Sequence, residues 1–134
     1  MAVAVITTLL GNQGDPVEYI VDQSVAVPKG TLMKLSASPQ TALAASADGD
    51  FFVGIAAVEK KANDGITILA LITHCIAEMT AGTGATTFGQ PQKISALNAV
   101  IDADDDTVAK AGEVVCLALE TAVDAARFAG LVNL

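Results

Sequence analysis

Hydrophobic residues occur in short runs that are separated by turn residues. Three runs, at residues 31–36, 51–59 and 66–77, lie between segments rich in Gly, Pro, Asn and Asp. The turn Asn63-Asp64-Gly65 between the second and third runs is typical of a β-hairpin. Further candidate strands follow at 93–95, 99–101, 113–121 and 127–132. Short strands at this spacing predict a mainly β domain, a small barrel or sandwich.

Two alanine-rich segments, 41–47 and 113–128, fit a helix as well as a strand. Alanine has the highest helix propensity, and hydrophobic period does not separate the two states in short apolar runs. We therefore expect one or two short helices at most. The Gly/Thr-rich stretch 80–89 is expected to be a mobile loop rather than a phosphate-binding turn, because no Gly-Lys-Ser/Thr ending follows it.

An internal repeat favours strands. Gly30-Thr-Leu-Met-Lys-Leu-Ser36 resembles Gly89-Gln-Pro-Gln-Lys-Ile-Ser95, 59 positions later. Ala56-Ala-Val-Glu59 resembles Leu117-Ala-Leu-Glu120, 61 positions later. The nearly constant offset suggests a duplicated strand unit and favours a strand at 114–120. The run 66–77 is apolar on both faces, so we expect it at the centre of a barrel or beneath a neighbouring subunit.

The composition indicates a surface that binds another protein. Of the 134 residues, 52% are hydrophobic and 16% are charged, against about 25% charged in average soluble domains. Some apolar surface is therefore expected to contact another protein. The apolar side chains are mostly small, which disfavours a roomy ligand pocket. A net charge of −8 without a basic cluster excludes a nucleic-acid surface.

The first ten residues are uncharged and apolar. They lack the basic segment of a secretory signal and are shorter than a membrane span, so no membrane association is expected. We divide the chain into an arm or first strand with a flexible joint, 1–14, and one β domain, 15–134. The arm is either an ordinary strand or a strand added to a partner's sheet. Its interface candidates are Val3, Val5, Ile6, Thr7, Thr8, Leu9 and Leu10.

Candidate chemistry is sparse. His74 is the only histidine, and adjacent strand residues such as His74 and Cys75 point to opposite faces. Pairing with Cys116 would leave no third group to orient the base, and the usual paired metal-ligand spacings are missing. We therefore expect buried, reduced cysteines and predict neither a catalytic site nor a cofactor.

One acidic segment resembles a calcium loop. Asp102, Asp104, Asp106 and Glu113 occupy loop positions one, three, five and twelve. Position six, which must turn sharply, is Thr107 rather than glycine, and the flanks do not read as helices. A solvated acidic turn is the simpler interpretation, with calcium binding as the alternative.

The order of five motifs resembles the tailed-phage capsid decoration (cement, head-stabilising) family. The motifs are Val27-Pro-Lys-Gly-Thr-Leu-Met-Lys-Leu35, Phe52-Val-Gly-Ile-Ala56, Thr87-Phe-Gly-Gln-Pro-Gln-Lys-Ile-Ser95, Cys116-Leu-Ala-Leu-Glu-Thr-Ala122 and Arg127-Phe-Ala-Gly-Leu-Val-Asn133. The resemblance covers residues 17–134 and implies a β fold, commonly a trimer, that binds the major capsid protein after shell expansion.

The resemblance further implies that the protein is assembled in the host cytoplasm and lies on the capsid exterior. The arm would then pair with a capsid strand. Two alternatives stay open. One is another virion β protein, such as a tail-tube or fibre-base component. The other, from a different class, is a small-molecule-binding barrel, which requires a cavity lined by large side chains.

Overall fold

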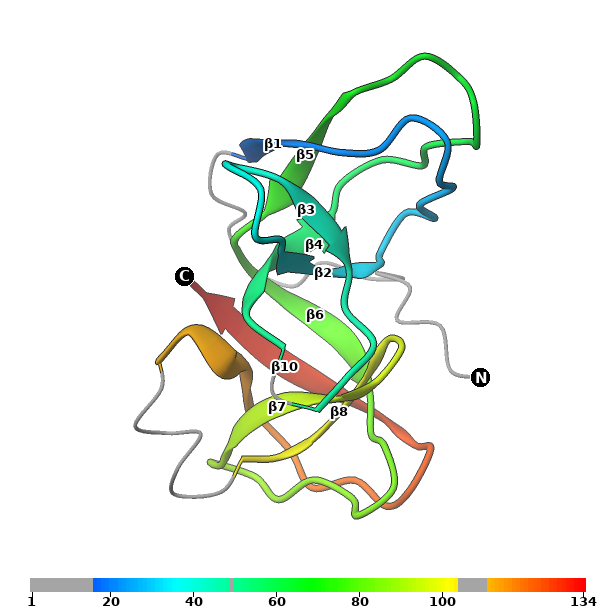
Figure 1. Ribbon diagram of the computed structural model, residues 1–134. Coiled ribbons are helices and arrows are strands. Elements are labelled where there is room, and N and C mark those ends of the chain that lie inside the picture. The colour runs from blue at the N-terminus through cyan, green and yellow to red at the C-terminus, as the bar shows by residue number, and fades with distance from the viewer. Residues whose placement is uncertain (1–15, 49, 104–110) are drawn as a thin grey trace.

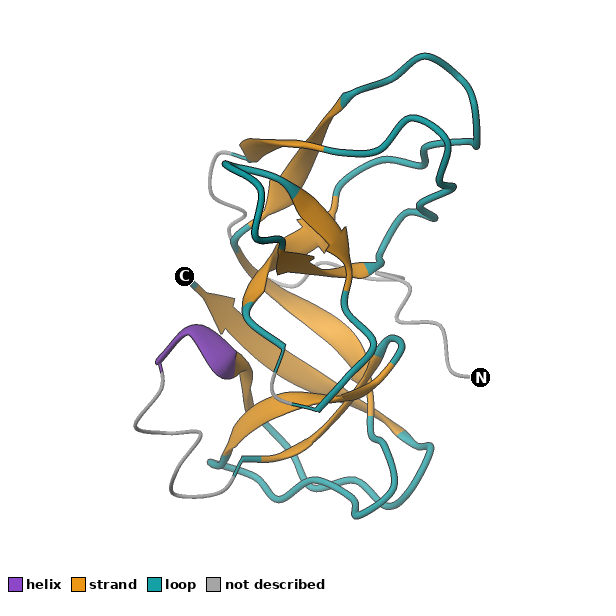
Figure 2. Ribbon diagram, viewed as in Figure 1, coloured by secondary structure: helices purple, strands orange, loops and turns teal. Residues whose placement is uncertain are grey.

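The protein consists of two antiparallel five-stranded sheets, one from each half of the chain (Figure 1). The computed structural model describes residues 16–48, 50–103 and 111–134. The predicted mainly β, sandwich-like fold is confirmed, and Figure 2 shows strands and loops almost throughout.

The N-terminal sheet has the strand order β1-β5-β4-β2-β3. We call residues 17–72 the N-terminal unit. Its strands are β1 (Val17–Ile20), β2 (Leu32–Leu35), β3 (Ala42–Ala44), β4 (Phe52–Ala56) and β5 (Ile68–Ile72).

The C-terminal sheet has the strand order β6-β10-β9-β7-β8. We call residues 74–134 the C-terminal unit. Its elements are β6 (His74–Thr80), β7 (Pro91–Ala96), β8 (Ala99–Asp102), the 3₁₀ turn η1 (Ala111–Glu113), β9 (Val114–Ala118) and β10 (Arg127–Asn133).

The two units are copies of one design. When five is added to each strand number of the N-terminal sheet, its strand order becomes that of the C-terminal sheet. The bulge between Met33 and Lys34 recurs 59 positions later, between Gln92 and Lys93. The predicted duplication of a strand unit is thereby confirmed.

Two glycines show why the repeat is visible in the sequence. Gly30 and Gly89 have φ values of 88° and 79°, which glycine adopts without strain. Gly30 N donates to Ala56 O over 2.9 Å, and Gly89 N donates to Ala118 O over 2.8 Å. Each glycine therefore turns the chain into the strand that follows it, β2 or β7. The hydrogen bond of each glycine holds that strand against its neighbour in the sheet, β4 or β9.

Each sheet curls until its two edges meet. A parallel bridge joins Ile20 to Thr41 in the N-terminal unit, and another joins Ala81 to Val100 in the C-terminal unit. These bridges reduce the exposed length of edge strand, which limits uncontrolled pairing with other chains.

The core has two parts. One cluster, which includes Met33, Leu69 and Leu71, fills the N-terminal unit. A larger cluster extends from the C-terminal unit to Leu32 and Ile55 of the N-terminal unit. At the same junction, Leu32 N donates to the buried Asn98 Oδ1 over 3.0 Å, and Lys93 Nζ lies 3.0 Å from Asp48 Oδ1. The units therefore share a packed interface.

Several expectations need correction. The predicted strand at 66–77 is two strands, β5 and β6, which lie in different sheets with Thr73 between them. The ambiguous segments 41–47 and 113–128 hold strands β3, β9 and the start of β10, and among the described residues the only helical element is η1. Strand β1 was not predicted, because four residues that include Glu18 give too short a pattern.

Candidate interaction surface

Of the three candidate nucleophile and metal residues, His74 and Cys75 lie on the edge strand β6 and Cys116 lies on the central strand β9 of the C-terminal sheet. Nδ1 of His74 is 3.1 Å from Asn133 Oδ1, on the neighbouring strand. Cys75 and Cys116 are free and buried in the larger core cluster. Burial raises the pKa of both thiols, and for Cys116 the proximity of Cys75 raises it further. Both thiols are therefore protonated near neutral pH and weakly nucleophilic.

Of the four calcium-ligand candidates, Asp102 and Glu113 are among the described residues, and Asp104 and Asp106 lie outside them. Asp102 Oδ1 accepts hydrogen bonds from Gln92 Nε2 at 2.8 Å and from Thr87 N at 2.9 Å. Partial burial raises the pKa of Asp102, but these hydrogen bonds outweigh it, so the pKa lies below its ordinary value. Within the described segments, no group of three or more His, Cys, Asp or Glu could hold a metal. The calcium loop stays a prediction.

The Gly/Thr-rich stretch borders a cavity of about 440 Å³ that is lined mainly by the C-terminal unit. Asp48, Thr83, Ser95 and Asp124 contribute its polar lining, and Gly84 N donates to Asp124 Oδ1 over 2.9 Å. The rest of the lining consists mainly of alanine and glycine. Apart from Ile101, this lining lacks the large hydrophobic side chains that small-molecule pockets usually present.

A buried lysine escaped the sequence analysis. The Lys60 side chain has no exposed surface. Its ammonium group donates to Gln23 O at 2.8 Å and Val25 O at 2.7 Å, and lies 3.6 Å from Asp64 Oδ1. These contacts tie the β4–β5 turn to the β1–β2 connection, so Lys60 holds structure together rather than offering a charge to a ligand. Its neighbour Lys61 looks equivalent in the sequence, and no pattern distinguishes the two.

The outer face of the C-terminal sheet carries an apolar row across four strands. On β6, β10 and β9, Ile76 lies opposite Leu131, and Leu131 lies opposite Leu117. Leu117 in turn lies opposite Pro91 on β7. We call these four residues the outer row.

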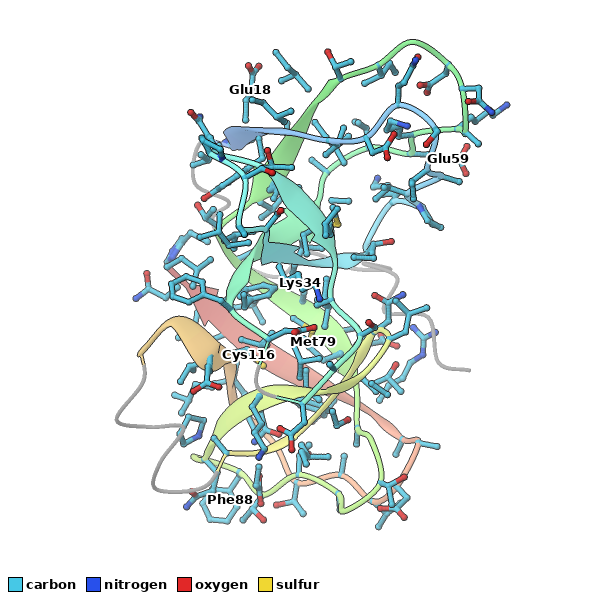
Figure 3. The ribbon with its side chains drawn as sticks, viewed as in Figure 1. Glu18, Lys34, Glu59, Met79, Phe88 and Cys116 are labelled. Atoms are coloured by element: carbon cyan, nitrogen blue, oxygen red, sulfur yellow. The ribbon has the colours of Figure 1, made fainter. Side chains whose placement is uncertain are left out.

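The row faces solvent. The strand neighbours of its members, such as Cys75, Cys116 and Val132, are buried in the core, so alternation places the row on the opposite side. Figure 3 shows Met79 and Cys116 among the strands of this unit. Leu117 is 39% exposed, and the other three members are half-buried.

A second apolar surface lies where the two units meet. It is a groove of about 560 Å³, lined by β1, the start of β4 and the C-terminal end of the chain. Val17, Phe51 and Leu134 on its wall are exposed. The interface candidates of the arm, Val3 to Leu10, lie outside the described residues. The groove and the outer row are thus two apolar surfaces that the described residues present.

Comparison with known proteins supports the fold. No protein-family model and no curated protein sequence matches the chain. Among solved structures, it is similar to the head fiber gp8.5 N base of bacteriophage phi29, with a TM-score of 0.51 and 15% identity. The match covers 87% of this chain and 92% of that chain.

Within the described parts of the chain, no helix has the length and apolar character needed to cross a membrane.

Proposed function

We propose that this chain is a structural protein of a tailed-phage virion that binds the outside of the assembled capsid and stabilises it as a decoration protein. The observation that carries the proposal is the fold, shared over 87% of the chain with the base of a phage head fiber. The order of the five sequence motifs supports the same class independently.

The exposed surface is suited to binding another protein. Large apolar side chains such as Phe51, Phe88 and Val123 are more than half exposed on a chain with few charges. Many weak contacts suffice for a decoration protein, because each copy or oligomer touches several capsid subunits at once. The function requires neither a cofactor nor a titrating base.

The capsid contact is assigned to the arm. Residues 1–10 carry β-branched and apolar side chains and can add a strand to an open sheet edge of the major capsid protein, where main-chain hydrogen bonds supply affinity. The first described strand, β1, lines the groove between the units. On the capsid the protein is expected to act as a trimer.

Imaging tests the proposal. Purified protein is mixed with bare expanded capsids of the phage that encodes it, and the particles are examined by cryo-electron microscopy. We expect new density at repeated lattice positions on the outer surface. Bare shells at saturating protein concentration would refute capsid binding.

A fibre-base role is the second candidate, and the similarity of the fold to the phi29 head fiber base favours it. A fibre base binds the head at sparse positions and carries a shaft, whereas a decoration protein covers equivalent lattice sites. Counting copies per particle in the same images separates the two. A tail-tube component would instead polymerise by itself into rings or tubes, which light scattering detects.

A further inference from the structure

Strand β6 has one unpaired edge. It pairs with β10 on one side and ends the C-terminal sheet on the other (Figure 1). Main-chain groups alternate between the two sides of a strand. Leu134 N donates to Thr73 O over 3.0 Å, so Thr73 and the odd-numbered residues of β6 face β10. The N–H and C=O groups of His74 and Ile76 therefore point away from β10, and no part of the described chain bonds to them.

The corresponding edge of the N-terminal unit is closed. There the edge strand is β1, whose Ile20 N donates to Gln40 O over 2.8 Å, and the Gln40 side chain donates to Glu18 O over 3.3 Å. The equivalent bond of the C-terminal unit, Gly82 N to Val100 O, lies just beyond the end of β6. Because β6 has seven residues and β1 has four, the additional length of β6 has no neighbour on this side. Such an edge can accept another strand.

The groove between the units leads from the start of the described chain to this edge. It is lined by Val17 of β1, by residues 51–53 around the start of β4 and by Thr73, which directly follows β5. Since β1 and β4 flank β5 on opposite sides, the groove crosses the β5–β6 junction from the β1 side to the β4 side. Even-numbered residues of β5 face β4, because Ala57 N donates to Ala70 O over 3.0 Å. The unpaired groups of β6 also belong to even-numbered residues, which places the unpaired edge on the side that the groove reaches.

The segment that fits this edge is the arm of the same chain. Residues 1–15 lie outside the described residues, and Val17, two positions after them, lines the groove. The joint, 11–15, can span about 17 Å when extended, whereas adjacent strands lie about 4.8 Å apart. Residues 3–10 are uncharged and mostly β-branched, a composition typical of strands. Eight strand residues span about 26 Å, enough to cover the seven residues of β6.

We propose that in the free protein residues 3–10 pair as an antiparallel strand with the unpaired edge of β6 in the same molecule. The entry point sets the direction, because the joint reaches β6 at His74 and the arm then runs toward Thr80 as it nears its N-terminus. His74 and Ile76 gain main-chain partners, and an edge at which free copies could associate is closed. The pairing does not depend on the proposed function. If the arm binds a capsid strand, it must first leave β6.

Amide hydrogen exchange, measured by NMR on the full chain and on a variant that lacks residues 1–10, tests the pairing. The His74 and Ile76 amides should exchange at least about tenfold more slowly in the full chain. The Cys75 and Ala77 amides, which face β10, are the internal control and should exchange alike in both proteins. Release of the arm is a local opening that leaves both described core clusters intact, so the exchange rates report it and the melting temperature does not.

Proline substitutions give a second test in the full chain. Adjacent strand residues direct their N–H groups to opposite sides, so one of Val5→Pro and Ile6→Pro removes a donor to β6. At least one of them should speed exchange of the His74 and Ile76 amides, whereas Ala2→Pro, outside the proposed strand, should not. Equal exchange in the full chain and in the truncated variant would overturn the proposal. Protection that is lost on dilution would also overturn it, because a second copy would then cover the edge. No capsid is present, so the result is independent of the capsid assay.

Discussion

At the residue scale, the two units place different side chains in equivalent core positions. Val27 and Thr86 lie 59 positions apart and form the same kind of antiparallel bridge, to Lys60 and to Ala122. Both residues are buried, but the Thr86 hydroxyl oxygen has no hydrogen-bond partner. A buried polar group without a partner destabilises the folded state.

Thr86→Val should therefore stabilise the protein. We expect the free energy of unfolding to rise by about 1 kcal/mol, because the substitution removes the unpaired hydroxyl and keeps the side-chain shape. Thr31→Val is the matched control. Thr31 is equally buried but donates to Pro28 O over 2.7 Å, so this variant should lose about 1 kcal/mol. Urea denaturation measures both, and equal effects would contradict the assignment.

The buried Lys60 gives a second residue-scale prediction. Lys60→Met leaves the carbonyls of Gln23 and Val25 without their charged donor, so the free energy of unfolding should fall by about 3 kcal/mol. Lys61→Met, at the exposed adjacent position, should change it by less than about 0.5 kcal/mol. Thermal and urea unfolding of the two variants measure these changes. Similar losses from both variants would show that Lys60 has no special role.

At the element scale, the loop before β4 is organised by one carboxylate. Asp50 Oδ2 accepts from the backbone N of Ser46 and of Ala47, each over 2.9 Å, and Lys34 Nζ lies 3.5 Å from Oδ1. Partial burial raises the pKa of Asp50, but the hydrogen bonds and Lys34 together lower it further, so the pKa lies below its ordinary value of 3.8. The ionised carboxylate is thus the form that stabilises this loop.

This pKa sets the sign of a pH dependence. A carboxyl group with a lowered folded-state pKa stabilises the protein above its unfolded pKa and loses that contribution as pH falls through the folded pKa. The stability difference between wild type and Asp50→Asn should be constant from pH 7 to about pH 5 and should shrink below about pH 4. Urea titrations at several pH values measure it. A difference that grows on acidification would contradict the role of Asp50.

The elements also differ in how well the sequence alone predicts them. The strands that begin the repeats were visible because Gly30 and Gly89 recur in a similar context. The break between β5 and β6 was not visible, because no Gly, Pro, Asn or Asp marks the change of sheet at Thr73. Nor could the outer row be predicted. Leu117 looks like a core residue until the strand register shows that its neighbours Cys116 and Ala118 face the core.

At the scale of the whole molecule, the design is a pair of similar β units, with an apolar row on the outer face of the C-terminal sheet and an apolar groove where the units meet. The units share a core cluster, a buried hydrogen bond and an ion pair, so they should unfold together. The proposed role of the arm is attachment to the capsid, which can be tested separately from the folding of the described units.

Deleting residues 1–10 tests the arm. The truncated protein should keep the melting temperature of the full chain, because the described cores involve residues from Val21 onward, with Tyr19 packed against them. Its affinity for capsids should fall roughly tenfold or more, equivalent to at least about 1.4 kcal/mol. Leu117→Glu serves as the comparison, since it alters the row and keeps the arm. Undiminished attachment of the truncated protein would rule out the arm as the capsid contact.

The most direct measurement of the central proposal is a co-sedimentation titration of the full chain with bare expanded capsids. Bound protein should rise with free protein and then level off at a fixed number of copies per particle, as expected for a finite set of equivalent lattice sites. If the protein stays in the supernatant at every concentration, or binds without saturation, the account of this chain as a capsid decoration protein is wrong.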